Sequence, residues 1–221
     1  MEKLIIKNPE YWNQACRELS EKDKKLANLI LKYSNLKIQS HGDPFTTLTR
    51  SIVGQQISVA AAESIWKKLY HLEAKYCDKY PEGKPLRPVS IIKNYQKLNS
   101  TGLSGRKKQY IHGLAKHFES NNYFSKQLLA MNDEDITRTL ISFPGIGDWT
   151  VKMFKIFCLM QPDIFPENDL SLTNAISKIY KIKSNGKKKE NITKLSEKWK
   201  PWRTVATWYL WCSVDQDPVY Y

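Results

Sequence analysis

The sequence predicts an all-α protein. Apolar residues recur at helical spacing along most of the chain, and no segment shows the strict alternation of a β-strand. Polar stretches with glycine or proline separate the periodic segments. Apolar residues make up 41% of the 221, with seven Trp, twelve Tyr and seven Phe, which is enough to bury a core. We therefore expect many short helices, in one compact domain or two small interleaved ones.

The N-terminal half divides at capping and breaking residues. Ser20 is a plausible N-cap for the second helix, with Asp23 in its first turn. Gly54 suits the left-handed position that ends a helix, and Ser58 can cap the helix that follows. Residues 54–58 then form a tight polar loop, which by itself is only a connector. The helices expected in this half cover residues 9–19, 20–33, 45–53, 58–69 and 90–98.

A polar stretch over residues 71–88 is expected to form a surface excursion. Beyond it, Ser104 can cap a helix that runs to about residue 119. Three cations, Arg106, Lys107 and Lys108, lie in the first turn of that helix, where the dipole favours acids. A nearby phosphate would relieve this conflict, and the alternative is a solvated basic face.

Two glycines organise the C-terminal half. Asn132 can cap a helix over residues 133–142, and Pro144 then leads into Gly145-Ile146-Gly147. Both glycines can take positive φ and bring backbone amides close to a ligand. Those amides precede the next helix, whose N-terminus favours an anion. The remaining helices are expected over residues 148–160, 170–179, 191–199 and 202–213.

Charge and cysteine usage limit the classes of function. Lys and Arg number 35 against 22 acids, for a net charge of +13. Such an excess indicates a polyanionic partner, or simply a lysine-rich proteome. The four cysteines are far apart and form no Cys-x-x-Cys pair, and the histidines show no ligand grouping, so we expect no zinc, iron–sulfur or other cofactor. With no signal peptide and no membrane span, we expect a soluble cytoplasmic protein, nucleoid-associated if bacterial.

Five blocks in order carry a resemblance to a known family. The segment Leu140–Thr150 contains Pro-Gly-Ile-Gly, and Asp169 follows about twenty residues later. This pattern resembles the helix-hairpin-helix and Gly-Pro-Asp signature of a superfamily of base-excision DNA glycosylases. The other blocks, at residues 50–59, 102–107, 163–170 and 199–206, resemble the type II 3-methyladenine DNA glycosylases.

The resemblance implies two helical subdomains with a cleft between them. One would hold residues 45–169, including the hairpin, and the other would combine residues 1–44 with 170–221. Long bacterial members carry an N-terminal β-rich domain, and the 44 residues before Phe45 leave no room for it. The resemblance also implies double-stranded DNA containing a damaged base as the partner, and we expect a monomer.

The chemistry of base removal points to Asp169. Cleaving an N-glycosidic bond leaves positive charge on the deoxyribose, which a carboxylate can stabilise while it orients water. Asp169 matches the family's catalytic aspartate. The alternative is that Asp169 only caps the helix that begins at Leu170, although Asn168 could do that instead.

The residue after Gly147-Asp148 separates two mechanisms within the superfamily. Relatives that also nick the strand carry a lysine there, which acts as an amine nucleophile. Here that position is Trp149, and Lys152 lies one turn away. We therefore expect a monofunctional glycosylase that leaves an intact abasic site.

The resemblance also implies a base pocket and a wedge. Trp149 and Trp211 match aromatic pocket positions, which suit a cationic alkylated purine, although either could instead be a core residue. Met153 stands where a bacterial member has tyrosine, so a less polar wall would narrow or shift the substrate range. Gln56 matches the residue that fills the gap left by the flipped nucleotide.

Phosphate contacts are expected around the hairpin. The resemblance implies that the amides of Gly145 and Gly147 hold a phosphate, with help from Thr150 and from a monovalent cation on the carbonyls of Phe143 and Ile146. Arg106, Lys107 and Lys108 are candidates for further backbone contacts.

The sequence therefore favours a monofunctional DNA glycosylase that excises alkylated purines of the 3-methyladenine and 7-methylguanine type. One alternative is a glycosylase for an etheno, deaminated or oxidised purine. The other is a non-catalytic helix-hairpin-helix DNA-binding protein.

Overall fold

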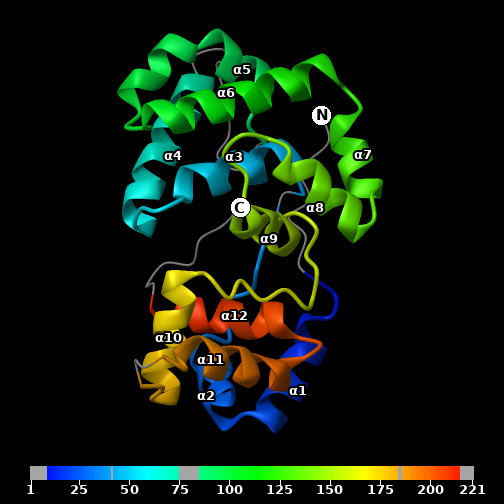
Figure 1. Ribbon diagram of the computed structural model, residues 1–221, viewed down its shortest axis with the longest axis vertical. Helices are drawn as coiled ribbons and strands as arrows, with labels where there is room; N and C mark the ends of the chain where they lie inside the picture. The colour runs from blue at the N-terminus through cyan, green and yellow to red at the C-terminus, as the bar shows by residue number, and fades with distance from the viewer. Residues whose placement is uncertain (1–8, 41, 75–84, 184–185, 215–221) are drawn as a thin grey trace. The chain divides into compact units, whose positions relative to one another are not determined.

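The computed structural model describes residues 9–40, 42–74, 85–183 and 186–214, and the elements that these residues form are all helices (Figure 1). The prediction of an all-α fold is therefore confirmed. Part of the 71–88 excursion, residues 75–84, lies outside the described residues, as do Cys77 and His41. Within the described parts, no helix combines the length and the apolar character needed to span a bilayer.

The chain forms two compact units. Among the described residues, the hairpin unit comprises 42–159, and the terminal unit comprises 9–40 together with 160–214. The expected boundaries were 44/45 and 169/170, so the observed division differs mainly in assigning residues 160–169 to the terminal unit. The physical reason lies in contacts between this segment and α12 (Arg203–Cys212), described below.

Helix α3 lies at the centre of the hairpin unit. It contacts α4, α6, α7 and α9 (Figure 1), and residues 44–53 are all buried, including several polar ones. The buried guanidinium of Arg50 is paired with Glu63 and lies 4.9 Å from the ring centroid of Trp66, which offsets the cost of removing this charge from water. The helices of this unit are α3 (Pro44–Gly54), α4 (Val59–Ala74), α5 (Pro88–Lys93), η1 (Tyr95–Ser100), α6 (Gly105–Ser120), α7 (Phe124–Ala130), α8 (Asp133–Ile141) and α9 (Asp148–Phe157).

Three predicted helix caps are confirmed. The side chain of Ser104 accepts from the amide of Lys107 at 3.3 Å, and that of Asn132 accepts from the amide of Asp135 at 2.9 Å. Ser58 accepts from the amide of Ala61 in the same way. Each of these bonds satisfies an amide that the first turn leaves without a helical partner.

Two predictions about helix ends are wrong. Ser20 lies inside α1 (Trp12–Lys22), where its hydroxyl donates to the carbonyl of Cys16, and the cap of α2 (Lys24–Lys32) is Asp23. Gly54 does not take the left-handed conformation; the residue with positive φ after α3 is Gln56, at +56°.

The short helix α7 has no clear signal in the sequence. It has no side-chain cap, and its formation depends on Phe124, whose ring centroid lies 4.9 Å from that of Phe118 and 5.8 Å from that of Phe143. Tertiary packing rather than local propensity therefore forms this helix.

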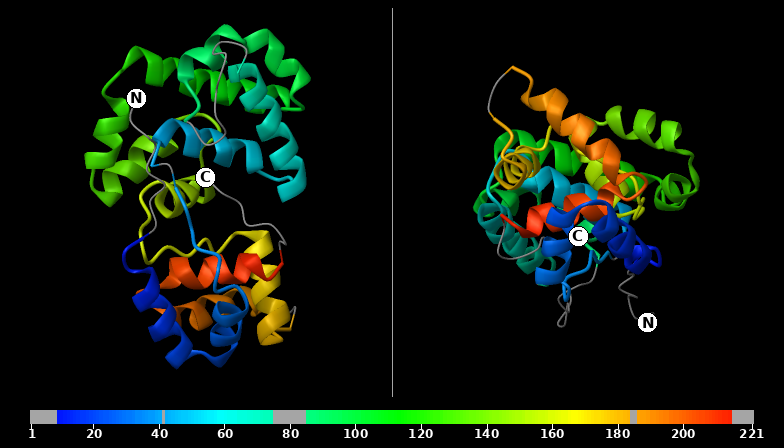
Figure 2. Two further views of the ribbon diagram at one scale, coloured as in Figure 1. Left: turned by 180° about the vertical axis from the view of Figure 1, so that it is seen from behind. Right: turned by 90° about the horizontal axis from the view of Figure 1, so that it is seen from below.

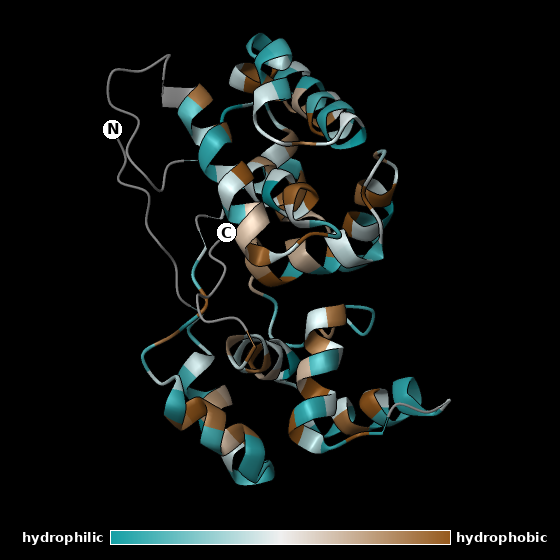
Figure 3. Cartoon of the chain, turned by 90° about the vertical axis from the view of Figure 1, so that its left-hand side faces the viewer, coloured by the Kyte–Doolittle hydropathy of each residue, from teal (hydrophilic) through white to brown (hydrophobic). Residues whose placement is uncertain are grey.

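The terminal unit is built around α12. This helix contacts α1, α2 and α10 (Figure 2), and most helices of the unit carry both apolar and polar residues (Figure 3). Trp199, Trp202 and Trp208 are buried in the core of this unit. The remaining helices of this unit are α10 (Leu170–Tyr180), α11 (Lys188–Ser196) and η2 (Glu197–Trp199).

Asp23 connects three elements of the terminal unit. Its Oδ1 accepts from the amide of Lys25 at 2.9 Å, which caps α2. Its Oδ2 accepts from the hydroxyl of Tyr180 at 2.7 Å and from the indole of Trp199 at 3.1 Å. Residues from both ends of the chain are thereby fixed to one carboxylate.

Candidate active site and nucleic-acid interface

The hairpin between α8 and α9 is a tight turn. The amide of Ile146 donates to the carbonyl of Phe143 at 3.1 Å, and the amide of Val151 donates to the carbonyl of Gly147 at 3.1 Å. Gly145 has φ +82°, as predicted, whereas Gly147 is extended, with φ −112° and ψ −177°. Only one of the two glycines therefore needs the left-handed conformation.

Tyr110 of α6 packs directly on Gly145. A Cβ added to Gly145 would lie 2.1 Å from Cδ2 of the tyrosine ring. The absence of a side chain thus allows the ring to cover the turn. The sequence does not indicate this contact.

Gly147 has the features expected of an anion-binding residue. It is exposed, no heavy atom lies within 4 Å of an added Cβ, and the described residues supply no acceptor to its amide. Gly147 is also the N-cap residue of α9, where the helix dipole favours negative charge.

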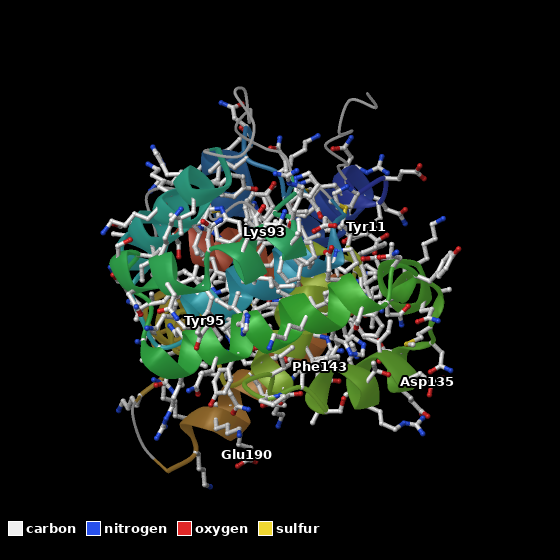
Figure 4. The ribbon with its side chains drawn as sticks, turned by 90° about the horizontal axis from the view of Figure 1, so that it is seen from above. Tyr11, Lys93, Tyr95, Asp135, Phe143 and Glu190 are labelled. Carbon is white, nitrogen blue, oxygen red and sulfur yellow. The ribbon has the colours of Figure 1, made fainter. Side chains whose placement is uncertain are left out.

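Phe143 anchors the start of the hairpin. In Figure 4 it is labelled beside the helices of the hairpin unit, and its ring centroid lies 4.9 Å from that of His117. Its carbonyl, one of the two expected ligands of a monovalent cation, already accepts the amide of Ile146 and keeps a second lone pair. Among the described residues, no three His, Cys, Asp or Glu side chains are grouped to hold a metal ion.

The loop after α3 contacts the hairpin. The side-chain Nε2 of Gln55 donates to the carbonyl of Gly145 at 2.8 Å and to the hydroxyl of Thr150 at 2.9 Å. Gln56, the predicted wedge, is exposed beside it. Thr150 is only 1% exposed and its hydroxyl faces the interior of the unit; its contribution to a phosphate contact stays a prediction.

The three cations of α6 differ in their surroundings. Arg106 is exposed. Lys107 donates from Nζ to the carbonyls of Val53 at 2.9 Å and Gln55 at 2.7 Å, and Lys108 donates to Asn99. The dipole conflict noted in the sequence is thus relieved for Lys107 by carbonyls at the end of α3 rather than by a ligand.

The three expected pocket residues and the expected catalytic residue fall into two pairs. Trp149 and Met153 lie on α9 in the hairpin unit; Trp149 is half-buried, and Met153 is 2% exposed. Asp169 and Trp211 lie in the terminal unit, where the indole Nε1 of Trp211 donates to Oδ1 of Asp169 at 3.1 Å. The structure brings the second pair into direct contact.

Asp169 is also a helix cap. Its Oδ1 accepts from the amide of Leu172 at 2.7 Å, so Asp169, and not Asn168, caps α10. Asn168 instead accepts from Nζ of Lys189 at 3.1 Å. Capping does not exclude catalysis, because a carboxylate has two oxygens and about four acceptor positions.

The segment before Asp169 is fixed to the start of α12. Arg203 donates from Nε to Oδ1 of Asp163 at 2.6 Å and from Nη2 to Oδ2 at 3.0 Å, a bidentate pair. The hydroxyl of Thr204 donates to the carbonyl of Gln161 at 2.6 Å and accepts from the amide of Ile164 at 3.0 Å. Asp163 and Ile164 belong to one of the blocks that carry the family resemblance, and Arg203 and Thr204 belong to another. The sequence does not indicate that these two blocks bond to each other.

The hairpin between α8 and α9 is followed by α10, which Asp169 caps. A family model, the HhH-GPD superfamily of base excision DNA repair proteins, matches residues 49–201. The chain belongs to this superfamily.

Individual relatives agree with this assignment. The chain is 30% identical over 210 residues to the alkylbase DNA glycosidase-like protein mag2 of Schizosaccharomyces pombe, covering 94% of this chain and 95% of that protein. It is 31% identical over 199 residues to a DNA-3-methyladenine glycosylase of Bacillus subtilis, covering 88% of this chain and 65% of that enzyme.

A solved structure extends the likeness to the fold. The 3-methyladenine DNA glycosylase Mag1 of S. pombe, in complex with abasic DNA, superposes with a TM-score of 0.74 at 26% identity. The match covers 90% of this chain and 95% of that one.

Proposed function

We propose that this protein is a monofunctional DNA glycosylase that excises alkylated purines of the 3-methyladenine and 7-methylguanine type from double-stranded DNA. The observation that carries the proposal is the carboxylate of Asp169, held by the amide of Leu172 and the indole of Trp211. Membership of a base-excision superfamily, and relatives named for this activity, support the choice of reaction.

The proposed role of Asp169 is electrostatic. As the base departs, positive charge develops on the sugar, and an oriented carboxylate stabilises that charge without reorganising. Two N–H donors on Oδ1 fix the orientation of the carboxyl group before the substrate arrives. The same group can hold the attacking water.

The residues near the hairpin support hydrolysis without strand cleavage. Trp149, which cannot form an imine, stands where a lyase needs its amine nucleophile. The nearest lysine on α9, Lys152, is ion-paired with Asp148 at 2.9 Å. We therefore propose that the product is an intact abasic site.

We propose that the hairpin unit binds the phosphate backbone of the DNA. The amide of Gly147 would bind a phosphate beside the lesion, with Arg106 adding a further backbone contact. A monovalent cation at the carbonyls of Phe143 and Ile146 would strengthen the same contact. We propose that the protein acts as a monomer, which sedimentation of the free protein and its DNA complex would test.

Base release from defined duplexes tests the reaction. Wild type is incubated with duplexes that carry 3-methyladenine, 7-methylguanine, ethenoadenine, hypoxanthine or 8-oxoguanine, and alkali then converts abasic sites to breaks. We expect cleavage after alkali for the alkylated purines. Release of only one of the other bases would reassign the substrate, and release of none would leave a non-catalytic DNA-binding protein.

Asp169→Asn tests the catalytic residue with little disturbance of the fold. Asparagine caps helices as well as aspartate does, and its oxygen can accept the same two bonds, so the variant removes the charge alone. We expect at least a roughly 100-fold loss of rate. Glu167→Gln, in the same turn, is the matched control and should keep its activity. Breaks without alkali, trapped by borohydride, would contradict the monofunctional assignment.

A further inference from the structure

We propose that Gln55 and Lys107 are positioning residues that hold the wedge residue Gln56 in place and connect it to the phosphate-binding hairpin. The proposal rests on the proposed function and deepens it. It assigns two residues of the hairpin unit to the step in which the damaged nucleotide leaves the duplex.

The backbone of Gln56 requires external support. Its φ of +56° lies in the left-handed region, which costs a residue with a side chain about 1–2 kcal/mol. Such a conformation persists only where surrounding contacts over-determine it. Gln56 is exposed, so its own side chain does not supply those contacts from the interior.

Lys107 supplies contacts on one side of the loop. Its Nζ bonds to the carbonyls of Val53 and Gln55, which belong to the last turn of α3 and to the residue before Gln56. A cation at a helix C-terminus also favours the dipole. Burial lowers the pKa of the Lys107 ammonium, in keeping with an interior position.

Gln55 supplies contacts on the other side. Its amide bonds to the carbonyl of Gly145 and to the buried hydroxyl of Thr150, which are in the hairpin and in the first turn of α9. The neighbouring residues Gln55 and Gln56 are thus fixed to the element that presents the amide of Gly147.

This arrangement has a consequence for base extrusion. A phosphate bound at the hairpin and a side chain that enters the duplex must keep a fixed separation, because both act on the same few nucleotides. The bonds of Gln55 set that separation before DNA binds, so the ordering cost is not paid during extrusion.

Binding to two duplexes tests the proposal without any chemistry. One duplex contains a tetrahydrofuran abasic analogue, and the other has the same sequence undamaged. Anisotropy gives a dissociation constant for each duplex. The ratio of the constant for the undamaged duplex to that for the abasic analogue measures how well the protein discriminates between them. Gln55→Met and Lys107→Met keep side-chain length and remove the donors. We expect each to lower the ratio about tenfold, with binding to the undamaged duplex changed less than about twofold.

Salt dependence separates positioning from phosphate contact. If Lys107 acts inside the protein, Lys107→Met leaves the slope of log K against log salt unchanged. Arg106→Met, the matched control from the same turn, should reduce the slope by about 0.9, the value for one lost phosphate contact. A reduced slope with an unchanged ratio in Lys107→Met would overturn the assignment.

Excision provides a second readout. An alkylated purine is placed in a matched duplex and in a bulge, where extrusion costs less. We expect Gln55→Met to lose more rate on the matched duplex than on the bulge; equal losses would contradict a role in extrusion.

Folding and function failures remain distinguishable. Thermal midpoints identify a variant that unfolds. Lys107→Arg, which keeps the donors, should retain the wild-type ratio. The double variant, Gln55→Met with Lys107→Met, should lose little more of the ratio than either single variant. A wild type that binds both duplexes equally, or wild-type ratios in both Met variants, would overturn the proposal. A wild type that discriminates but releases no base would refute only the proposed activity.

Discussion

Replacing Gly145 with alanine should destabilise the hairpin unit strongly. At φ +82° an alanine costs about 1–2 kcal/mol in backbone energy. The new Cβ would lie 2.1, 2.5 and 2.7 Å from three ring carbons of Tyr110, whereas carbon atoms pack at about 3.5–4.0 Å. Moving the ring adds about 1–3 kcal/mol of overpacking. We expect a loss near 3 kcal/mol, or roughly 6–12 °C in Tm for a chain of this size.

Urea and thermal unfolding measure this effect, and the same hairpin contains its control. Gly147→Ala meets no atom within 4 Å and keeps an extended backbone, so it should change stability by less than about 0.5 kcal/mol. In a Tyr110→Ala background, Gly145→Ala should cost only the backbone part. Equal losses for the two glycine variants, or no coupling to Tyr110, would refute the reasoning.

Three further predictions concern individual side chains. Trp211→Phe keeps the aromatic ring but removes the indole donor to Asp169, so kcat for base release should fall at least about tenfold while DNA affinity holds. Asp133→Asn should lower the free energy of unfolding by about 1–3 kcal/mol, which is more than Lys155→Met should. The first change leaves the buried Lys155 ammonium without the carboxylate that lies 2.7 Å away, and the second leaves only an exposed acid. Chemical denaturation compares the two variants. Burial raises the pKa of the Cys158 thiol from 9.0 to about 12, so above pH 9 the unfolded chain loses a proton that the folded one keeps. The free energy of unfolding should therefore fall with rising pH by up to about 1.4 kcal/mol per unit more than in Cys158→Ala.

Local signals were sufficient where one side chain acts on its own helix. The caps at Ser104 and Asn132 were predicted correctly because the bond joins residues three apart and needs no distant partner. The same reasoning failed at Gly54. There the left-handed residue is Gln56, and the residue before it, Gln55, accepts from Lys107 of α6 and donates to Gly145 and to Thr150 of α9.

The candidate site also combines residues that local patterns indicate with contacts that only the tertiary structure shows. The position of Asp169 in its motif indicated it as the candidate catalytic carboxylate, but the indole of Trp211 that bonds to it comes from 42 residues further along the chain. Lys107 was a candidate for phosphate contact from its position, and Thr150 from the resemblance. The structure adds that Lys107 bonds to a carbonyl at the end of α3 and that the side chain of Thr150 is buried, which the sequence does not indicate.

The sequence by itself determined the helical class, the hairpin with its glycines, the superfamily and the aspartate on which the proposed reaction depends. The helical class follows from periodicity, whereas the superfamily and the candidate aspartate follow from the resemblance of five sequence blocks to a known family. Only the tertiary structure decided which cations and hydroxyls are internal, which residue takes the strained backbone, and that Tyr110 rather than the turn alone requires Gly145. The physical reason is that a side chain's role is set by the nearest acceptor or ring, and those partners lie far away in the sequence.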